Sequence, residues 1–101
     1  MEEPEILRAD NLMRPEDEIA VLHTRMSVSL PHSHDFVEFA YVDAGRGYHI
    51  IDGQRDTIQK GNFFIINTQV PHEYASEPGA EIVMYNCIFR PDCLGLSLGE
   101  E

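Results

Sequence analysis

Turn signals recur along the chain at short intervals, and they limit the folds that are open to it. Asp52-Gly53 lies between two extended runs, which is a strong hairpin signal, and Gly45-Arg46-Gly47, Lys60-Gly61 and Glu77-Pro78-Gly79 punctuate the rest. No segment of useful length shows the 3.6-residue period of an amphipathic helix. Short strands separated by such turns predict an all-β sandwich or barrel.

The runs between these turns are rich in β-branched and aromatic residues, as strands are. The run 63–66, Phe-Phe-Ile-Ile, is apolar at every position, so we expect it in the core. The run 19–30 alternates imperfectly and should hold one or two strands. The other expected strands are 5–7, 36–42, 48–51, 55–59, 72–75 and 81–89.

The size and charge of the chain limit the functional classes to which the protein can belong. The 101 residues are 43% hydrophobic, which suits one small domain that dimerisation would help to stabilise. A net charge of −11, from 18 acidic and 7 basic residues, argues against binding to nucleic acid or to an anionic membrane. No apolar run is long enough to span a membrane, and the acidic start of the chain is unlike a signal peptide. We therefore expect a cytoplasmic protein.

The two cysteines, Cys87 and Cys93, are six residues apart and form neither a CxxC motif nor a disulfide framework. We expect free thiols in a reducing compartment. Cys87 lies in an apolar run and should belong to the core, whereas Cys93 should be partly exposed.

The chain divides into three parts on composition. We expect a loosely packed lead-in at 1–18, a barrel at 19–90, and a helix starting near 92–98. The last residues end abruptly, so 91–101 is interpreted as the start of a linker helix that was cut.

His32, His34 and Glu38 share one parity in the run that follows Pro31. In one continuous strand their side chains would lie on the same face. Two imidazoles and a carboxylate are a partial ligand set for a divalent transition metal, and His72 is the candidate fourth ligand. The alternative is a polar pocket with structural histidines, in which Glu38 pairs with one of them.

This spacing resembles that of the cupins, small β-barrels of the jelly-roll (double-stranded β-helix) type. Four residues fit their first motif, H-x-H-x3-E-x6-G: His32, His34, Glu38 and Gly45. Met26 stands where a glycine usually precedes the first histidine. The second motif is partial, because Gly61 and His72 fit it while three of its positions carry Asn67, Gln69 and Ser76.

More narrowly, the stretch 30–74 is similar to the N-terminal sensing domain of AraC-type transcriptional regulators. In that family the barrel precedes two helix-turn-helix units, which are missing here. The resemblance implies a domain that binds a small-molecule effector, such as a sugar or a similar metabolite, and that forms a homodimer. DNA would be contacted only through the missing C-terminal helix-turn-helix domain.

Under this resemblance, the residues expected to bind the effector are His32, His34, Glu38, His72, Tyr48 and Tyr74. The same histidines and Glu38 would hold a divalent transition metal (Zn, Ni, Mn or Fe), if the domain uses one. Further candidates for the pocket walls, each of which is otherwise plain core, are Phe36, Tyr41 and Phe64.

Two other functions remain open. The ligand set suits a stand-alone metal-dependent cupin enzyme of the dioxygenase, isomerase or decarboxylase type. No additional acid–base residue can be assigned to it, because strand alternation turns Glu73 away from the face of His72. The third hypothesis is a dimerisation module with a vestigial pocket.

Overall fold

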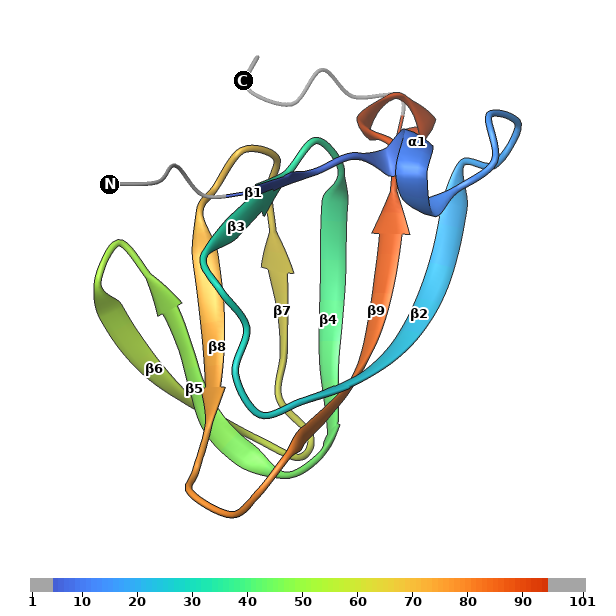
Figure 1. Cartoon of the computed structure of the whole chain (residues 1–101). Coiled ribbons are helices and arrows are strands. Elements are labelled where there is room, and N and C mark those ends of the chain that lie inside the picture. The colour runs from blue at the N-terminus through green and yellow to red at the C-terminus, as the bar shows by residue number, and fades with distance from the viewer. Residues whose placement is uncertain (1–4, 95–101) are drawn as a thin grey trace.

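Two β-sheets face each other in the computed structural model, which describes residues 5–94 (Figure 1). One sheet has five strands in the order β1-β3-β8-β5-β6, and the other has four in the order β2-β9-β4-β7. The elements are β1 (Glu5–Leu7), α1 (Ala9–Leu12), β2 (Ile19–Met26), β3 (His32–His34), β4 (Val37–Ala44), β5 (Arg46–Ile51), β6 (Gln54–Gln59), β7 (Phe63–Ile66), β8 (His72–Ser76), β9 (Ile82–Phe89) and a 3-10 turn η1 (Pro91–Leu94).

The chain crosses from one sheet to the other several times, as in a jelly-roll. The central pairs of the four-stranded sheet are antiparallel: β9 pairs with β2 on one side and with β4 on the other. In the five-stranded sheet, β8 pairs with β3 and β5. The predicted all-β fold is confirmed, and the fold is that of a cupin barrel in one small domain. Within the described part of the chain, no helix has the length and apolarity needed to cross a bilayer.

Strand alternation builds the interior. Along β9, Ile82, Met84 and Ile88 are almost fully buried, while Tyr85 between them is 43% exposed. The inward residues of β9 pack against inward residues of β4, β6 and β8, which gives one core cluster: Ala40, Val42, Ile58, Tyr74, Ile82 and Met84. The core therefore lies between the sheets, where each strand contributes every second residue.

Glycine is required where strands cross closely. Gly45, the glycine of the first motif, has a φ of 92°, and a Cβ atom there would overlap the carbonyl oxygen of Glu81. Only glycine adopts that backbone conformation without strain and also lets the start of β9 approach the end of β4.

Two predictions about the core are wrong. Phe63 is 69% exposed and Ile65 59% exposed, so only half of β7 points inward. β7 is an edge strand, and its alternate residues face outward on the four-stranded sheet. Cys87 is half-buried on the same outer face rather than in the core, because its neighbours Asn86 and Ile88 take the inward positions of β9.

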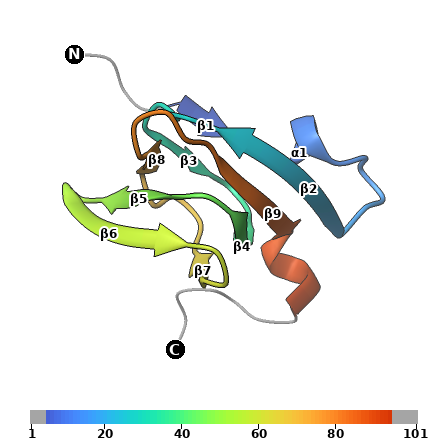
Figure 2. The same cartoon turned by 90° about the horizontal axis from the view of Figure 1, so that it is seen from below.

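Residues 5–13 are packed on the barrel, in contrast to the expected loose lead-in. β1 runs parallel to β3, and Ala9 and Met13 are buried in a second cluster with Phe36 and Ile88. The Asp35 carboxylate accepts a hydrogen bond of 2.8 Å from the backbone N–H of Ala9. In both views α1 lies at the end of the barrel where β2 begins and β9 ends (Figures 1 and 2).

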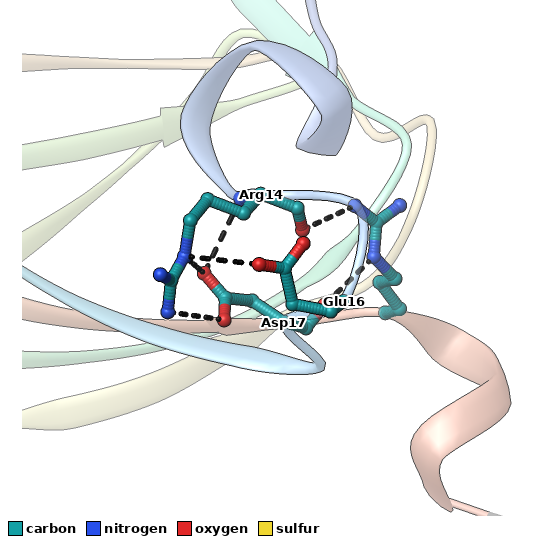
Figure 3. A network of polar contacts seen from close by, with 4 residues as sticks. Arg14, Glu16 and Asp17 are labelled. Carbon is teal, nitrogen blue, oxygen red and sulfur yellow. Dashed lines mark hydrogen bonds and ion pairs between the residues drawn. The ribbon is translucent and has the colours of Figure 1, made fainter.

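The loop between α1 and β2 is held by exposed charges (Figure 3). Arg14 donates to the carboxylate of Asp17 and lies 3.7 Å from Glu16. Arg90, just after β9, donates to the backbone carbonyl of Asp17 at 3.0 Å. Exposed ion pairs of this kind contribute little to stability, so their main effect is to fix the path of the loop.

The C-terminal prediction is tested only at its start. Residues 91–94 form a 3-10 turn instead of the first turn of an α-helix. The rest of the predicted helix, residues 95–98, lies outside the described residues, and so does the expected cut at 101.

Candidate functional site

His32, His34 and Glu38 do not lie on one continuous strand, which changes how the site is built. β3 ends at His34 in one sheet, and β4 begins at Val37 in the other. Asp35 and Phe36 connect the two sheets, held by the hydrogen bond from the Ala9 N–H to Asp35 and by burial of the Phe36 ring. The condition under which the three side chains would share one strand face is therefore not met. His34 and Glu38 still converge, because the inner faces of the two sheets face each other.

Three buried side chains meet between the sheets: His34 (0% exposed), Glu38 (7%) and His72 (2%). Each offers one ligand atom, and these atoms lie within 4.8 Å of one another. The fourth predicted ligand, His32, is the register partner of His72, and the two ring centroids are 4.4 Å apart. His32 stands beside the three but does not join their cluster. We call His34, Glu38 and His72 the triad.

The two triad histidines each use one ring nitrogen for a protein contact. His34 Nδ1 lies 2.7 Å from the carbonyl oxygen of Phe36, so Nδ1 must carry the proton and donate. This leaves the lone pair on His34 Nε2. His72 Nδ1 lies 2.9 Å from His49 Nε2, and a proton on His72 Nδ1 likewise leaves the lone pair on His72 Nε2. Partners of this kind fix the tautomer and ring orientation of metal-binding histidines.

Glu38 is also held by a buried polar neighbour. Asn86 donates from Nδ2 to Glu38 Oε2 at 2.5 Å, and Thr24 donates from its hydroxyl to Asn86 Oδ1 at 2.9 Å. The second carboxylate oxygen, Oε1, lies 3.4 Å from His34 Nε2. Each member of the triad therefore has one atom anchored by the protein and one atom directed at the other two.

Three buried polar atoms in this region have no hydrogen-bond partner among the described residues: His34 Nε2, His72 Nε2 and the Tyr74 hydroxyl. A buried polar group without a partner costs about 1–3 kcal/mol. Two of the three atoms belong to the triad, and the third is on the same strand as His72, two residues further along. The cluster has the features of a binding site that needs another species to complete it.

Burial controls the charge of the triad. It lowers the pKa of His72 to about 3, with further lowering by the neighbouring histidines His32, His49 and His34. It also lowers the pKa of His34 and raises the pKa of Glu38, against the opposing hydrogen bond from Asn86. The contact of His34 with Glu38 is therefore not an ion pair, because both pKa values move away from the charged forms.

A hollow of about 210 Å³ opens beside Glu38 in the barrel interior. One part of its wall is polar and is made by Thr24, His32, Glu38, Tyr74 and Asn86. The other part is apolar and is made by Leu7, Leu12, Leu22, Met26, Phe36 and Ile88. The apolar wall includes one residue of β1 and one of α1, so the N-terminal segment lines one side of the hollow. We call this space the interior hollow.

A family model described as an AraC-like ligand binding domain matches residues 21–101. The chain belongs to this family. Curated relatives include the HTH-type transcriptional activator RhaR of Escherichia coli strain K12, which is 36% identical over 67 residues. That alignment covers 66% of this chain and 23% of RhaR, and the match to RhaR of Shigella flexneri serotype 5b has the same extent. The chain thus spans about a quarter of the length of these relatives.

Solved structures share the fold of this AraC-like domain at low identity. A cupin protein from Bacteroides fragilis has a TM-score of 0.67 at 18% identity, covering 84% of this chain and 77% of that one. A Cupin 2 conserved barrel protein from Salinispora arenicola has a TM-score of 0.68 at 15% identity, covering 81% and 71%. The polyketide cyclase RemF from Streptomyces resistomycificus has a TM-score of 0.67 at 20% identity, covering 76% and 59%.

Sequence reasoning missed two buried residues of the AraC-like domain. His49 is 6% exposed, contacts His72, and stacks against the rings of Phe64 and Tyr74. Asn86 is 7% exposed and anchors Glu38. Both carried a signal in the sequence: Asn86 has the inward parity of its apolar strand, and His49 sits in the hairpin strand that leads to Asp52-Gly53.

The aromatic candidates separate by strand face. Tyr74 (2% exposed) lies inside, Phe36 stacks on His34 at 4.3 Å, and Phe64 stacks on His49 at 4.5 Å. Tyr48 lies on the other face of β5 from His49, with the Arg55 guanidinium 4.1 Å over its ring. Tyr41 is 41% exposed on the outer face of β4. The structure brings Tyr74 to the site and places Tyr48 and Tyr41 outside it.

Proposed function

We propose that this AraC-like domain senses a small-molecule effector for a transcriptional regulator and binds it in the interior hollow. The observation that carries the proposal is the buried Tyr74 hydroxyl, which has no protein partner and belongs to the wall of that hollow. Burial raises the pKa of Tyr74 well above its usual value, so the hydroxyl stays a hydrogen-bond donor at neutral pH. An effector oxygen would accept that bond.

The lining defines the kind of effector. A space of 210 Å³ holds about seven water molecules' worth of liquid, which fits a compact metabolite. Among the described residues that line it, none is a lysine or an arginine, so a strongly anionic effector lacks a protein counter-charge. Hydroxyl, amide, imidazole and carboxyl groups on one wall and apolar side chains on the other suit an uncharged polyhydroxy compound such as a sugar.

Paired tyrosine variants test the effector site. Thermal unfolding in the presence of a panel of neutral sugars and polyols should identify compounds that raise the melting temperature. Tyr74→Phe should weaken binding of such a compound about tenfold, because one buried hydrogen bond is lost. Tyr48→Phe is the matched control on the outer face and should bind like the wild type. Equal effects of the two substitutions would refute an effector site at Tyr74.

The triad also fits a divalent metal ion, which we include in the proposal. Its donors are two imidazole nitrogens and one carboxylate oxygen, a set that suits Fe, Mn, Ni or Zn. Ligands about 2.0–2.2 Å from one ion lie at most about 4.4 Å apart, so a pair at the 4.8 Å limit must approach by about 0.4 Å. An ion would use both orphan Nε2 atoms and would favour the ionised form of Glu38.

Access and chemistry are consistent with such an ion. A second hollow of about 280 Å³, between Pro31 and Pro71, reaches His72 from outside the barrel. A bound ion would act as a Lewis acid toward an effector oxygen in the interior hollow, which Glu38 also lines. His34, Glu38 and His72 would hold it, and His32 would face the effector.

The regulatory role needs partners outside the described residues. We propose that DNA is contacted by a separate helix-turn-helix domain, that the regulator is a homodimer, and that it works in the cytoplasm. RhaR is named as an HTH-type activator, and the acidic charge of this domain suits a division of labour in which another part binds DNA. Effector binding would act by a population shift, which requires different affinities for two states of the regulator.

A second candidate function is catalysis by a metal-loaded enzyme. Two histidines and one carboxylate that leave coordination positions open are the ligand set of many Fe(II) oxygenases, and this observation favours it. Mass spectrometry of a bound compound after incubation with the Fe(II)-loaded protein separates the two functions. An effector is recovered unchanged, whereas conversion to a product would establish the enzyme.

A further inference from the structure

The outer side of the four-stranded sheet is apolar across all four strands. Two rows of register partners cross it from β2 through β9 and β4 to β7, the strands that stand side by side in Figure 1. The rows are Val21, Cys87, Phe39, Ile65 and His23, Tyr85, Tyr41, Phe63. We call these eight residues the outer apolar face.

This surface is unusual for an acidic protein. The chain carries 18 acidic and 7 basic residues, yet the outer apolar face contains none of them. The ion pair of Arg25 with Glu81, at 3.5 Å, lies beyond its end. On the solvent-facing side of an antiparallel sheet, the outward residues of each strand are normally polar. Eight outward residues without a carboxylate, ammonium or guanidinium group therefore indicate a surface that another molecule covers.

The exposed apolar area approaches the area that one partner buries in a protein–protein interface. Six large side chains of the face are 41–69% exposed. With about 150–250 Å² for a whole aromatic side chain and somewhat less for valine and isoleucine, the exposed apolar area is on the order of 600 Å². A typical monomer leaves patches of about 300–600 Å², and each partner of a stable complex buries about 800 Å². Partly exposed neighbours at the rim supply the remainder.

The face is also complementary to itself. A hollow of about 290 Å³ lies on it, lined by Val21, Phe39, Tyr41, Phe63, Tyr85 and Cys87 together with Ala40. The most exposed side chains of the face form a ridge on each edge strand, with Val21 (65%) on β2 and Phe63 (69%) and Ile65 (59%) on β7. The less exposed rings of Phe39, Tyr41 and Tyr85 (41–43%) lie between the two ridges. A two-fold axis through the face would set an edge ridge of each copy against the hollow of the other, as an isologous interface requires.

We infer that the outer apolar face is the surface through which a second copy of this chain docks. The inference deepens the proposed function, because it assigns a surface to the homodimer of the proposed regulator. It does not depend on the metal or on the identity of the effector. Each copy contributes the same two rows of residues, and the two barrels pack sheet against sheet with Cys87 near the centre of the contact.

Sedimentation equilibrium of the 101-residue protein from 1 µM to 1 mM tests this surface. The wild type should dimerise, and Phe63→Glu should raise the dimer dissociation constant at least about 100-fold, because the dimer loses two buried rings and would bury two carboxylates. Val28→Glu is the matched control, since Val28 is also 69% exposed but lies between β2 and β3, outside the face. It should leave the dissociation constant within about threefold of the wild-type value.

Thiol labelling provides a second measurement that needs no change to the face. In a Cys93→Ser background, Cys87 is the only cysteine left. Its reaction rate with a maleimide should fall at least about tenfold between 1 µM and 1 mM protein, as dimerisation covers it. A dimer whose Cys87 rate is constant, and which Phe63→Glu leaves intact, overturns the assigned surface alone. A wild type that stays monomeric at 1 mM overturns the dimer as well, and the face then belongs to another segment or to a different protein.

Discussion

At the scale of single residues, the site depends on atoms that the triad does not itself supply. His34 is oriented by the carbonyl of Phe36, His72 by His49, and Glu38 by Asn86. Each contact leaves one donor atom free and directed inward. A metal site with such partners has rigid ligands before the ion arrives, which raises its affinity.

We predict that His49→Phe lowers metal affinity by about 10- to 100-fold, the usual effect of removing an outer partner of a ligand. The substituted ring can still stack against Phe64 and Tyr74, but it offers no nitrogen to His72. Competition with a chromogenic chelator gives the dissociation constant. His49→Gln, which offers a hydrogen-bonding group near the position of Nε2, should recover part of the loss. Equal affinity in the wild type and His49→Phe would show that His49 does not position His72.

We also predict that the metal-free protein loses stability on acidification from pH 7 to pH 5. Burial lowers the pKa of His49 to about 4 and that of His72 to about 3, so between pH 6.5 and 4 the unfolded chain binds these protons first. The free energy of unfolding therefore decreases as the pH is lowered. Glu38, whose pKa is raised, acts in the opposite direction, and we expect a net loss of about 2 kcal/mol.

Urea unfolding in the presence of EDTA measures that difference. A His49→Phe, His72→Phe double variant lacks both titrating groups and should show a smaller loss between the two pH values. A wild type equally stable at pH 5 and pH 7 would contradict the burial argument.

At the scale of elements, the sequence predicted strands better than it predicted their partners. Turn signals placed β5, β6 and β9 within about two residues, because glycine and proline act locally. The separate strand at 36–42 was expected, but its place in the opposite sheet from His34 could not be predicted, since that depends on Ala9 and on pairing with distant strands. β7 was misassigned to the core because a strand that is apolar at every position has no polar–apolar alternation from which its inward face could be predicted.

The site shows the same difference between features that depend on local sequence and features that depend on long-range contacts. His34, Glu38 and His72 could be predicted from motif spacing, and they cluster. His49 could not be linked to His72 in this way, because their contact joins β5 to β8 across 23 residues. Because neighbouring residues of a strand face opposite sides, the inward position of His49 places Tyr48 on the outer face.

We predict that the N-terminal segment is a separable element held on the barrel by Asp35. Asp35→Ala removes the acceptor for the Ala9 N–H and should destabilise the packing of β1 and α1 by about 1 kcal/mol. Limited proteolysis should then cut near residues 8–17 several times faster. Asp35→Asn keeps an acceptor oxygen and should behave more like the wild type. If both variants are cut at the wild-type rate, other contacts hold the segment.

At the scale of the whole molecule, the two sheets present opposite chemistry on their two sides. Between them lie the triad, the Tyr74 hydroxyl and the interior hollow, where polar atoms lack partners. Outside the four-stranded sheet lies the outer apolar face, whose eight residues carry no carboxylate, ammonium or guanidinium group. An effector that completes the interior would act on strands β4 and β9, which also carry the outer apolar face.

Titration of the chelator-stripped protein with Co²⁺ tests the central claim, that the triad is a divalent metal site in an effector-sensing barrel. We predict one ion per chain, with visible absorption bands that show nitrogen and oxygen ligands. His72→Ala should abolish these bands while circular dichroism shows the same β-sheet content, and His32→Ala should retain them. Absence of Co²⁺ binding, or binding that His72→Ala leaves unchanged, would contradict the account.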